Sequence, residues 1–294
     1  MIATARPTLR WHSAWAKTLP IAALAVGVLL ARPFLPAWGF MWVLAVATFQ
    51  SVKWLTLVQY VERARTVSLR LSVAYLCGWP GMDAKAFLSR KPAKLSRLEW
   101  YSAIAKLVFG GVLLWGVARL AMPLSPLAAG WIGMAGLLFM MHFGFFHLLS
   151  LSWREAGFDA RPLMNAPILA NSVSDFWSRR WNMAFRDAAY QLVFRPLSSR
   201  VGGVVAALAV FGVSGIVHDL VISLPAGAGF GLPTLYFAIQ AVGFLCERRH
   251  PSLRTSWPGR CLAIVIVLGP LPLLFHTPFV NAVVLPMLTA FGAL

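Results

Sequence analysis

Two polar side chains in apolar surroundings are the residues of this chain most able to do chemistry together. Asn182 ends the stretch DFWSRRWN (175–182), and His218 lies in the stretch SGIVHD (214–219). An ionisable group inside an apolar membrane segment is energetically costly, so it indicates a functional site by default. Burial disfavours the charged form of histidine, and the neutral ring has a nitrogen that can accept a proton. His218 is therefore a candidate general base.

The segments that must hold these residues are those of a membrane protein. Of the 294 residues, 59% are hydrophobic and 12% are charged, and the mean hydropathy is +0.73. A soluble domain carries about twice that charged fraction. Eight apolar segments follow one another along the chain, at about 18–36, 40–60, 101–121, 126–149, 203–223, 232–246, 261–275 and 278–293. About 20 helical residues cross a hydrocarbon core of ~30 Å.

We therefore predict an all-α polytopic membrane protein with about eight transmembrane helices and an interfacial amphipathic helix. Residues 1–294 are expected to form a single integral membrane domain, because the chain has no internal repeat and no room for a separate soluble domain beside the apolar segments. The last two apolar segments are short and share Pro270, Pro272 and Pro278, so they could instead form one broken hairpin.

The net charge of +17 bears first on membrane topology. Such a charge would suggest nucleic acid in a soluble protein, but 22 of the 26 lysine and arginine residues fall in segments 1–17, 61–100, 151–200 and 248–260. Eight crossings with the N-terminus inside put all four segments on one side, as the positive-inside rule requires. We expect these loops in the cytoplasm and no nucleic-acid partner. Attraction to anionic lipids or to a phosphate-bearing substrate would be a secondary use.

Two further expectations follow from the basic residues. A cleavable N-terminal signal would leave seven crossings and put the basic loops on the wrong side, so we expect an uncleaved first span. The remaining four basic residues lie near the ends of spans or inside them, where long side chains can snorkel to the interface. They are Arg32, Lys53, Lys106 and Arg119.

The stretch from Ser174 through Asn182 to Leu192 has the pattern of an amphipathic helix at the inner membrane surface. An apolar stripe recurs at three- and four-residue spacing, with Ser174 as the expected N-cap. The stripe consists of Trp177, Trp181, Ala184, Ala188 and Leu192. Asn182 lies on the polar face, which it shares with Arg179 and Arg186. The alternative is a solvated, basic interfacial helix without a catalytic role.

His218 lies 15 residues beyond Gly203, about 22 Å along a helix, and therefore within the bilayer. Ser214 is one turn earlier and could hydrogen-bond the ring. The alternative is a histidine that bonds a neighbouring helix as part of packing. For His142 and His147, spaced H-x4-H, we favour that packing interpretation.

The sequence lacks the motifs that several other kinds of catalysis require. The nine acidic residues form no D-x-x-D pair or cluster, which argues against a magnesium-dependent transferase. Neither a G-x-S-x-G elbow nor a P-loop is present. The three cysteines have no metal-ligand spacing. We expect no bound metal and no cofactor.

Three segments together resemble one family. The stretch NSVSDFWSRRWN (171–182) resembles the S-x-x-x-F-W-x-R-R-W-N segment of wax synthases, which belong to the membrane-bound O-acyltransferase superfamily. The stretch SGIVHD resembles its S-G-x-x-H-[ED] segment, and LYFAIQ (235–240) with Gly243 and Glu247 resembles a downstream segment. The motif core covers about 165–250. WPGM (79–82) also resembles bacterial wax-synthase-like proteins, so we expect a bacterial cytoplasmic membrane.

The resemblance implies an O-acyltransferase that moves a fatty acyl group from acyl-CoA, its co-substrate, to the hydroxyl of a lipophilic alcohol within the lipid bilayer. His218 would be the general base, and Asn182 would orient the reacting groups or stabilise the developing oxyanion. The residues expected to bind substrate are Trp177, Arg179, Arg180, Trp181, Arg186 and Ser214. The arginines would hold the coenzyme phosphates.

Other functions stay open at this point. Ser178 replaces the glycine usual in plant members, and the chain is short, which leaves the acceptor undefined. A polar acceptor such as a polysaccharide is one alternative, although branches that use it usually have R-x-W-H where this chain has Arg180-Trp181-Asn182. A transporter or a non-catalytic scaffold is another. Catalysis requires residues 183–202 to fold back so that Asn182 and His218 face one cavity.

Overall fold

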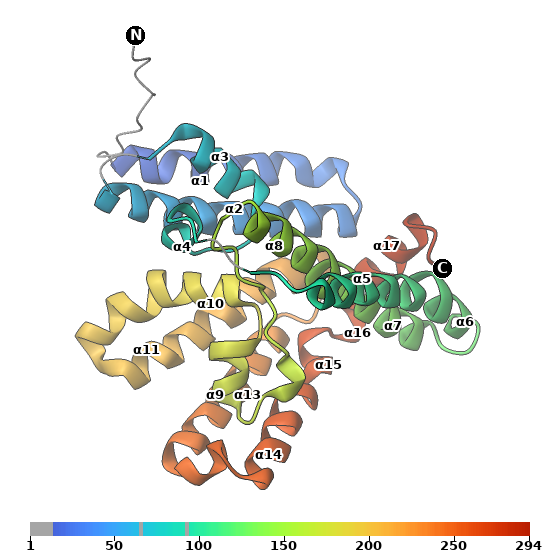
Figure 1. The fold of residues 1–294 in the computed structure, drawn as a ribbon. Coiled ribbons are helices and arrows are strands. Elements are labelled where there is room, and N and C mark those ends of the chain that lie inside the picture. The colour runs from blue at the N-terminus through green and yellow to red at the C-terminus, as the bar shows by residue number, and fades with distance from the viewer. Residues whose placement is uncertain (1–13, 65–66, 92–93) are drawn as a thin grey trace.

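The computed structural model describes residues 14–64, 67–91 and 94–294, which form helices and no strand (Figure 1). The predicted all-α class is confirmed. Arg6 and Arg10 of the N-terminal basic segment lie outside the described residues. The α-helices are α1 (Ala14–Ala31), α2 (Ala37–Ala64), α3 (Leu69–Gly78), α4 (Ala84–Leu88), α5 (Arg97–Gly111), α6 (Ala118–Ala121), α7 (Pro126–Leu138), α8 (Phe146–Glu155), α9 (Val173–Asp175), α10 (Met183–Ala189), α11 (Arg195–His218), α12 (Leu224–Ala226), α13 (Leu232–Arg249), α14 (Trp257–Leu268), α15 (Leu271–Leu274), α16 (Thr277–Phe279) and α17 (Leu285–Ala290).

Shorter helical segments complete the architecture and often continue an α-helix. Three are 3-10 helices, at Arg32–Phe34, Pro167–Leu169 and Pro251–Arg254. The π-helical segments are Val112–Val117, Phe139–Phe145, Phe176–Arg180, Tyr190–Phe194, Asp219–Ser223 and Val280–Val284. Segments of this kind insert one residue into a helical turn and are frequent at functional sites. One of them begins directly after His218.

Six helical segments of the described chain are long and apolar enough to cross a membrane. They are Lys17–Phe34, Ala37–Ala64, Arg97–Ala121, Pro126–Glu155, Met183–Ala226 and Trp257–Leu274. The expected span 232–246 is present as α13, but its last turn carries Glu247, Arg248 and Arg249. The expected span 278–293 corresponds to the shorter apolar helix Thr277–Ala290. The protein is therefore an all-α polytopic membrane protein, with six helices of spanning length in its described part.

The longest of these segments, Met183–Ala226, is a hairpin rather than one rod. At Gly202 the backbone has φ 82° and ψ 160°, which no helix contains. Glycine reaches this region without the steric cost that a Cβ imposes. The legs before and after Gly202 run back along each other, α10 into α11 (Figure 1). The predicted fold-back of residues 183–202 is thus present.

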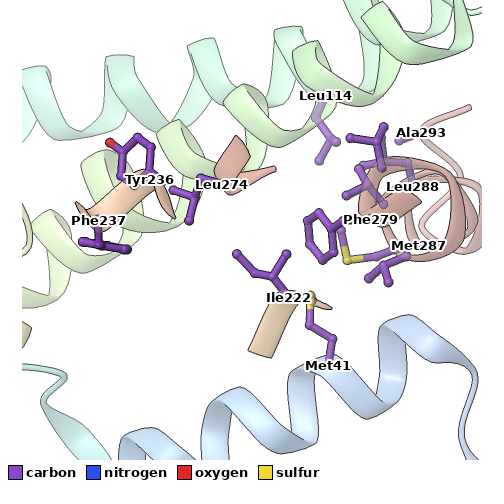
Figure 2. Close-up of a cluster of buried hydrophobic side chains, with 13 residues drawn as sticks. Met41, Leu114, Ile222, Tyr236, Phe237, Leu274, Phe279, Met287, Leu288 and Ala293 are labelled. Carbon is purple, nitrogen blue, oxygen red and sulfur yellow. The ribbon is translucent and has the colours of Figure 1, made fainter. Parts of the chain in front are cut away.

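One buried hydrophobic cluster holds the chain on both sides of the histidine. Ile222, in the π-helical turn after His218, and Phe237 of α13 pack into it with Met41 of α2 (Figure 2). Phe279 and Leu288 from the C-terminal helices complete the same cluster. Burying large apolar side chains from elements far apart in sequence stabilises their mutual placement. The end of α11 and the start of α13 are fixed in this way.

The expectation that Lys53 snorkels to the interface is wrong. Its side chain is fully buried and donates from Nζ to the carbonyl oxygen of Gly81 at 2.6 Å. The ammonium also lies 3.6 Å from the centroid of the Tyr75 ring. Buried charges require such partners. Lys53 therefore holds the WPGM turn against α2 instead of reaching toward solvent.

Candidate active site

The His218 ring is held in one tautomer by its own helix. Its Nδ1 lies 2.7 Å from the carbonyl oxygen of Ser214. Since a carbonyl only accepts hydrogen bonds, Nδ1 carries the proton and donates, and Nε2 keeps the free lone pair. The expected bond from the Ser214 hydroxyl is wrong, because that hydroxyl donates to the carbonyl of Val210 at 2.8 Å. Ser214 thus contributes its backbone to the site.

The next residue, Asp219, fastens α11 to α13. Its carboxylate accepts from the backbone N–H of Gly231 at 2.7 Å and of Thr234 at 3.1 Å, and from the Thr234 hydroxyl. A Cβ added at Gly215 would lie 2.8 Å from the Cα of Thr234, so the two backbones touch there. Three bonds to one carboxylate and this close approach set the position of His218 against α13.

A second histidine supports Asp219 from the other side. The Ser223 hydroxyl lies 3.0 Å from Asp219 Oδ1 and 3.3 Å from His276 Nε2. The backbone N–H of Phe279 donates to His276 Nδ1 at 3.2 Å, so the ring proton is on Nε2 and points at Ser223. Because His276 donates here, it does not activate the Ser223 hydroxyl as a nucleophile. Ser223 and His276 therefore hold the Asp219 carboxylate in position through hydrogen bonds.

The motif segment before Asn182 is not the single helix that the stripe predicted. The helix begins two residues earlier than expected, with Ser172 rather than Ser174 as N-cap, since its hydroxyl accepts from Asp175 N–H at 2.9 Å. It then ends at Trp181, whose backbone is extended. A new helix, α10, starts at Met183. The expected position of Asn182 on the polar face of one continuous helix is therefore wrong.

Asn182 makes the joint between these two helices. Its backbone is left-handed, with φ 42° and ψ 65°, a conformation that asparagine tolerates better than most residues. Its side-chain Oδ1 accepts from Phe185 N–H at 3.4 Å as the N-cap of α10. That bond assigns Oδ1 to the cap and leaves the Nδ2 amide without a hydrogen bond in the described chain. Asn182 can therefore donate to a bound substrate.

The loop after α8 holds this joint from outside. Asn165 N–H donates to the carbonyl of Arg180 at 2.8 Å, and Met183 N–H donates to the carbonyl of Leu163 at 2.8 Å. Between them, Asn182 N–H points to the Met164 sulfur at 3.4 Å. The backbone groups on either side of Asn182 thus find their partners in the loop 163–165, about 15 to 20 residues earlier.

One face of α13 holds the motif segment from inside. Glu247, buried and located at the end of α13, accepts from the backbone N–H of Val173, from Ser174 N–H at 3.0 Å and from the Ser174 hydroxyl at 2.6 Å. Gln240 Oε1 accepts from the Trp177 indole N–H at 3.2 Å. Between them, Gly243 leaves room for the Val173 side chain, 3.1 Å from where a Cβ would be. A carboxylate at a helix N-terminus also suits the helix dipole.

The two motif segments meet at an aromatic side chain of α13. Phe237 lies between them, with ring centroids 5.4 Å from Trp177 and 4.7 Å from His218. Trp181 instead stacks on Phe176, with centroids 5.3 Å apart. No hydrogen bond joins Asn182 to His218 within the described residues, and the cavity that they are expected to share stays a prediction.

The arginines expected to bind phosphates differ in what they already contact. Arg180 pairs with Asp175 at 2.5 Å and also donates to the carbonyl of Ala166. Arg186 pairs with Asp187 at 2.6 Å. Arg179 is exposed and makes no ion pair or side-chain hydrogen bond in the described part of the protein. Of the three guanidinium groups, that of Arg179 is the most available to a ligand.

Removing the Glu247 carboxylate should destabilise the protein at the motif segment. In Glu247→Ala, the buried N–H groups of Val173 and Ser174 lose their acceptor, which costs on the order of 3 kcal/mol. We expect the apparent Tm, followed by tryptophan fluorescence in detergent, to fall by several degrees. Glu155→Ala is the control, since Glu155 is exposed. Equal Tm values for both variants would show that Glu247 does not anchor the motif segment.

Comparison with known proteins agrees with the resemblance. Residues 160–239, which contain both Asn182 and His218, match the model of the membrane bound O-acyl transferase family. The chain is similar to this family over that stretch. It is 32% identical over 145 residues to a probable long-chain-alcohol O-fatty-acyltransferase 9 of Arabidopsis thaliana, covering 43% of this chain and 42% of that protein.

Two further relatives are similar over shorter stretches. A long-chain-alcohol O-fatty-acyltransferase of Simmondsia chinensis is 42% identical over 74 residues, covering 22% of this chain and 20% of the relative. An acyl-CoA–sterol O-acyltransferase 1 of Arabidopsis thaliana is 36% identical over 70 residues, covering 21% and 20%. Over these stretches the chain is wax synthase-like, and the matches span less than half the length of each of these relatives. These relatives are plant proteins, so the bacterial membrane stays a prediction.

Proposed function

We propose that this protein transfers a fatty acyl group from acyl-CoA to the hydroxyl of a lipophilic alcohol. The observation that carries the proposal is the tautomer of His218, whose Nδ1–H is engaged by the Ser214 carbonyl. An imidazole with a free Nε2 lone pair, next to apolar and aromatic side chains, is suited to take a proton from a neutral alcohol. The matched relatives are named as enzymes of this kind, with long-chain alcohols or a sterol as acceptors.

In the proposed reaction, His218 Nε2 takes the hydroxyl proton while the alcohol oxygen attacks the thioester carbonyl carbon. The Asn182 Nδ2–H donates to the carbonyl oxygen as negative charge develops on it. When the tetrahedral intermediate collapses, the C–S bond breaks and the departing CoA sulfur receives the proton from His218. An ester and free CoA result. The step needs no group beyond the chain and its two substrates.

A membrane site suits these substrates. The alcohol, the acyl chain and the ester partition into the bilayer, whereas CoA is soluble and anionic. Excluding water from the reacting atoms also protects the thioester from hydrolysis. Exposed Arg179, three residues before Asn182, is the group that we assign to the CoA phosphates. Arg180, already paired with Asp175, is assigned to holding the motif segment.

The assignment of Arg179 predicts a change in KM rather than in kcat. Arg179→Gln should raise the KM for palmitoyl-CoA about two- to fivefold, the range expected when an exposed charge pair is lost. The KM for the alcohol should stay unchanged. Arg200→Gln, at the far end of the hairpin near Gly202, is the control. An equal KM in wild type and in Arg179→Gln would remove Arg179 from the coenzyme site.

The acceptor class can be tested with a panel. Membranes containing the protein would receive radiolabelled palmitoyl-CoA with hexadecanol, a sterol or a soluble oligosaccharide, and the products would be separated by thin-layer chromatography. We expect ester with hexadecanol and none with the oligosaccharide. Transfer to the oligosaccharide alone would overturn the lipophilic acceptor in favour of the polar one. No transfer with any acceptor would favour a scaffold or a transporter.

A further inference from the structure

A small pocket lies apart from the proposed catalytic groups. It is formed by α5, by the π-helical segment Phe139–Phe145 with the start of α8, and by the loop after α8. Its polar walls are Lys106, His142 and His147. Phe143 and the loop residues 162–164 form its apolar walls. Lys106 lies inside the candidate span Arg97–Ala121 and both histidines inside Pro126–Glu155. Ionisable groups at such positions indicate a function by default.

One ring nitrogen of His142 in this pocket lacks a hydrogen-bond partner. Its Nδ1 is buried and has no hydrogen-bond partner, the one such side-chain atom in the described part of the chain. The ring packs edge-on against Phe146, with centroids 5.3 Å apart, so its position is fixed by apolar contact. Native proteins rarely leave a buried polar atom unpaired, so a ligand or solvent partner is indicated. The packing role that the H-x4-H spacing suggested accounts for the ring but not for this nitrogen.

Lys106 adds an uncompensated positive charge. It forms no ion pair with any carboxylate of the described residues. Glu99, which lies on the same helix, is already paired with Arg154 at 2.8 Å. The pocket therefore offers an ammonium and two imidazoles, all able to donate, and no acidic side chain. This set of groups is complementary to an anion.

We propose that this pocket binds the carboxylate of a single-chain amphiphile such as a long-chain fatty acid, with its hydrocarbon chain in the bilayer. A carboxylate balances the Lys106 charge and accepts hydrogen bonds from ammonium and imidazole donors, whereas an alcohol hydroxyl leaves that charge unbalanced. The cavity has a volume of about 10 Å³, enough for one carboxylate oxygen and too small for the phosphodiester of a two-chain lipid. The inference is independent of the proposed acyl transfer.

Occupancy would also bear on the joint at Asn182. The pocket wall includes Leu163 and Met164, and the same two residues contact the backbone of Met183 at 2.8 Å and of Asn182 at 3.4 Å. A bound headgroup would thus brace the loop that holds Asn182 in its left-handed conformation.

The test measures binding of tritiated oleate to the purified full chain in detergent, by scintillation proximity. We expect Lys106→Met and His142→Asn each to weaken oleate binding at least tenfold. The matched controls Lys85→Met and His250→Asn change exposed residues outside the pocket and should bind as wild type does. Unlabelled oleyl alcohol and phosphatidylglycerol, added as competitors, should not displace oleate.

Three results would overturn the inference. They are no saturable oleate binding by the wild type, unchanged binding in both pocket variants, or displacement by oleyl alcohol or phosphatidylglycerol as effective as by oleate itself. The first result would indicate that a water molecule, rather than a fatty acid, is the partner of His142 Nδ1. Size-exclusion profiles establish that each variant is folded, and His142→Asn, which keeps a polar side chain, decides the matter if Lys106→Met aggregates. Ester formation is not the readout, so failure here is distinct from failure of the proposed acyl transfer.

Discussion

Replacing His218 by asparagine is expected to lower kcat for ester formation by about 10²- to 10⁴-fold, the usual contribution of a general base. The asparagine amide can still donate to the Ser214 carbonyl, which His218 Nδ1 contacts at 2.7 Å, but it has no basic nitrogen. The variant therefore separates proton transfer from the local hydrogen bond. Turnover would be measured as labelled palmitoyl ester formed per unit of folded protein.

The control for this experiment is His250→Asn, because His250 is exposed at the end of α13. Its turnover should match that of the wild type. An apparent Tm close to the wild-type value would establish that His218→Asn is folded. Turnover within about twofold of wild type in a folded His218→Asn would leave the histidine as a packing residue, the alternative that the sequence left open.

Three substitutions at Asn182 should separate its backbone role from its chemical role. Asn182→Gly keeps the positive φ and loses only a few tenths of a kcal/mol of capping, so it should fold normally. Asn182→Asp keeps the cap and tolerates the left-handed backbone, but it replaces the donating amide with a carboxylate. In both, kcat should fall by about 10²- to 10³-fold, as expected when one oxyanion donor is lost.

The third variant, Asn182→Ala, should differ in stability. Alanine loses the cap, at about 1 kcal/mol, and takes on a left-handed backbone, at roughly 1–2 kcal/mol. We expect it to lose both activity and apparent Tm, whereas the glycine variant loses activity alone. Full turnover in Asn182→Gly would mean that asparagine is needed here only for the joint between the two helices.

The break between the two helices at Asn182 could not be predicted from the hydrophobic pattern. The stripe from Trp177 to Leu192 keeps helical spacing across Trp181, so periodicity alone continues the helix through the break. What ends it is the loop 163–165, which offers carbonyl and amide partners to the backbone of residues 180–183. Such long-range partners leave no periodic signal. One local signal was present, because asparagine is a residue that favours both positive φ and the N-cap.

The positioning groups on α13 were partly visible in the sequence. Gln240, Gly243 and Glu247 stood out in the family resemblance, but no role followed from it. Their spacing puts them on one helical face, and a buried glutamate at the end of an apolar helix requires partners. That these partners are the amides of residues 173 and 174, more than seventy residues earlier, follows only from the tertiary structure.

Other features of the fold were within reach of the sequence. The apolar segments predicted the helical membrane class because hydrocarbon demands that backbone groups be satisfied within helices. The free nitrogen of His142 was not predictable, since H-x4-H spacing alone does not reveal which ring atoms find partners. Lys53 and Lys106 looked alike as basic residues inside spans, yet one is bonded to Gly81 and the other faces a pocket.

The most direct test of the central claim follows both products with purified protein. Labelled palmitoyl-CoA and hexadecanol would be mixed with the wild type, and palmityl ester and free CoA thiol would be quantified over time. We predict equal amounts of ester and thiol, with negligible thiol released when hexadecanol is omitted, and formation of both products slowed at least about 10²-fold in His218→Asn. Thiol release without the alcohol, or ester formation undiminished in His218→Asn, would contradict the account.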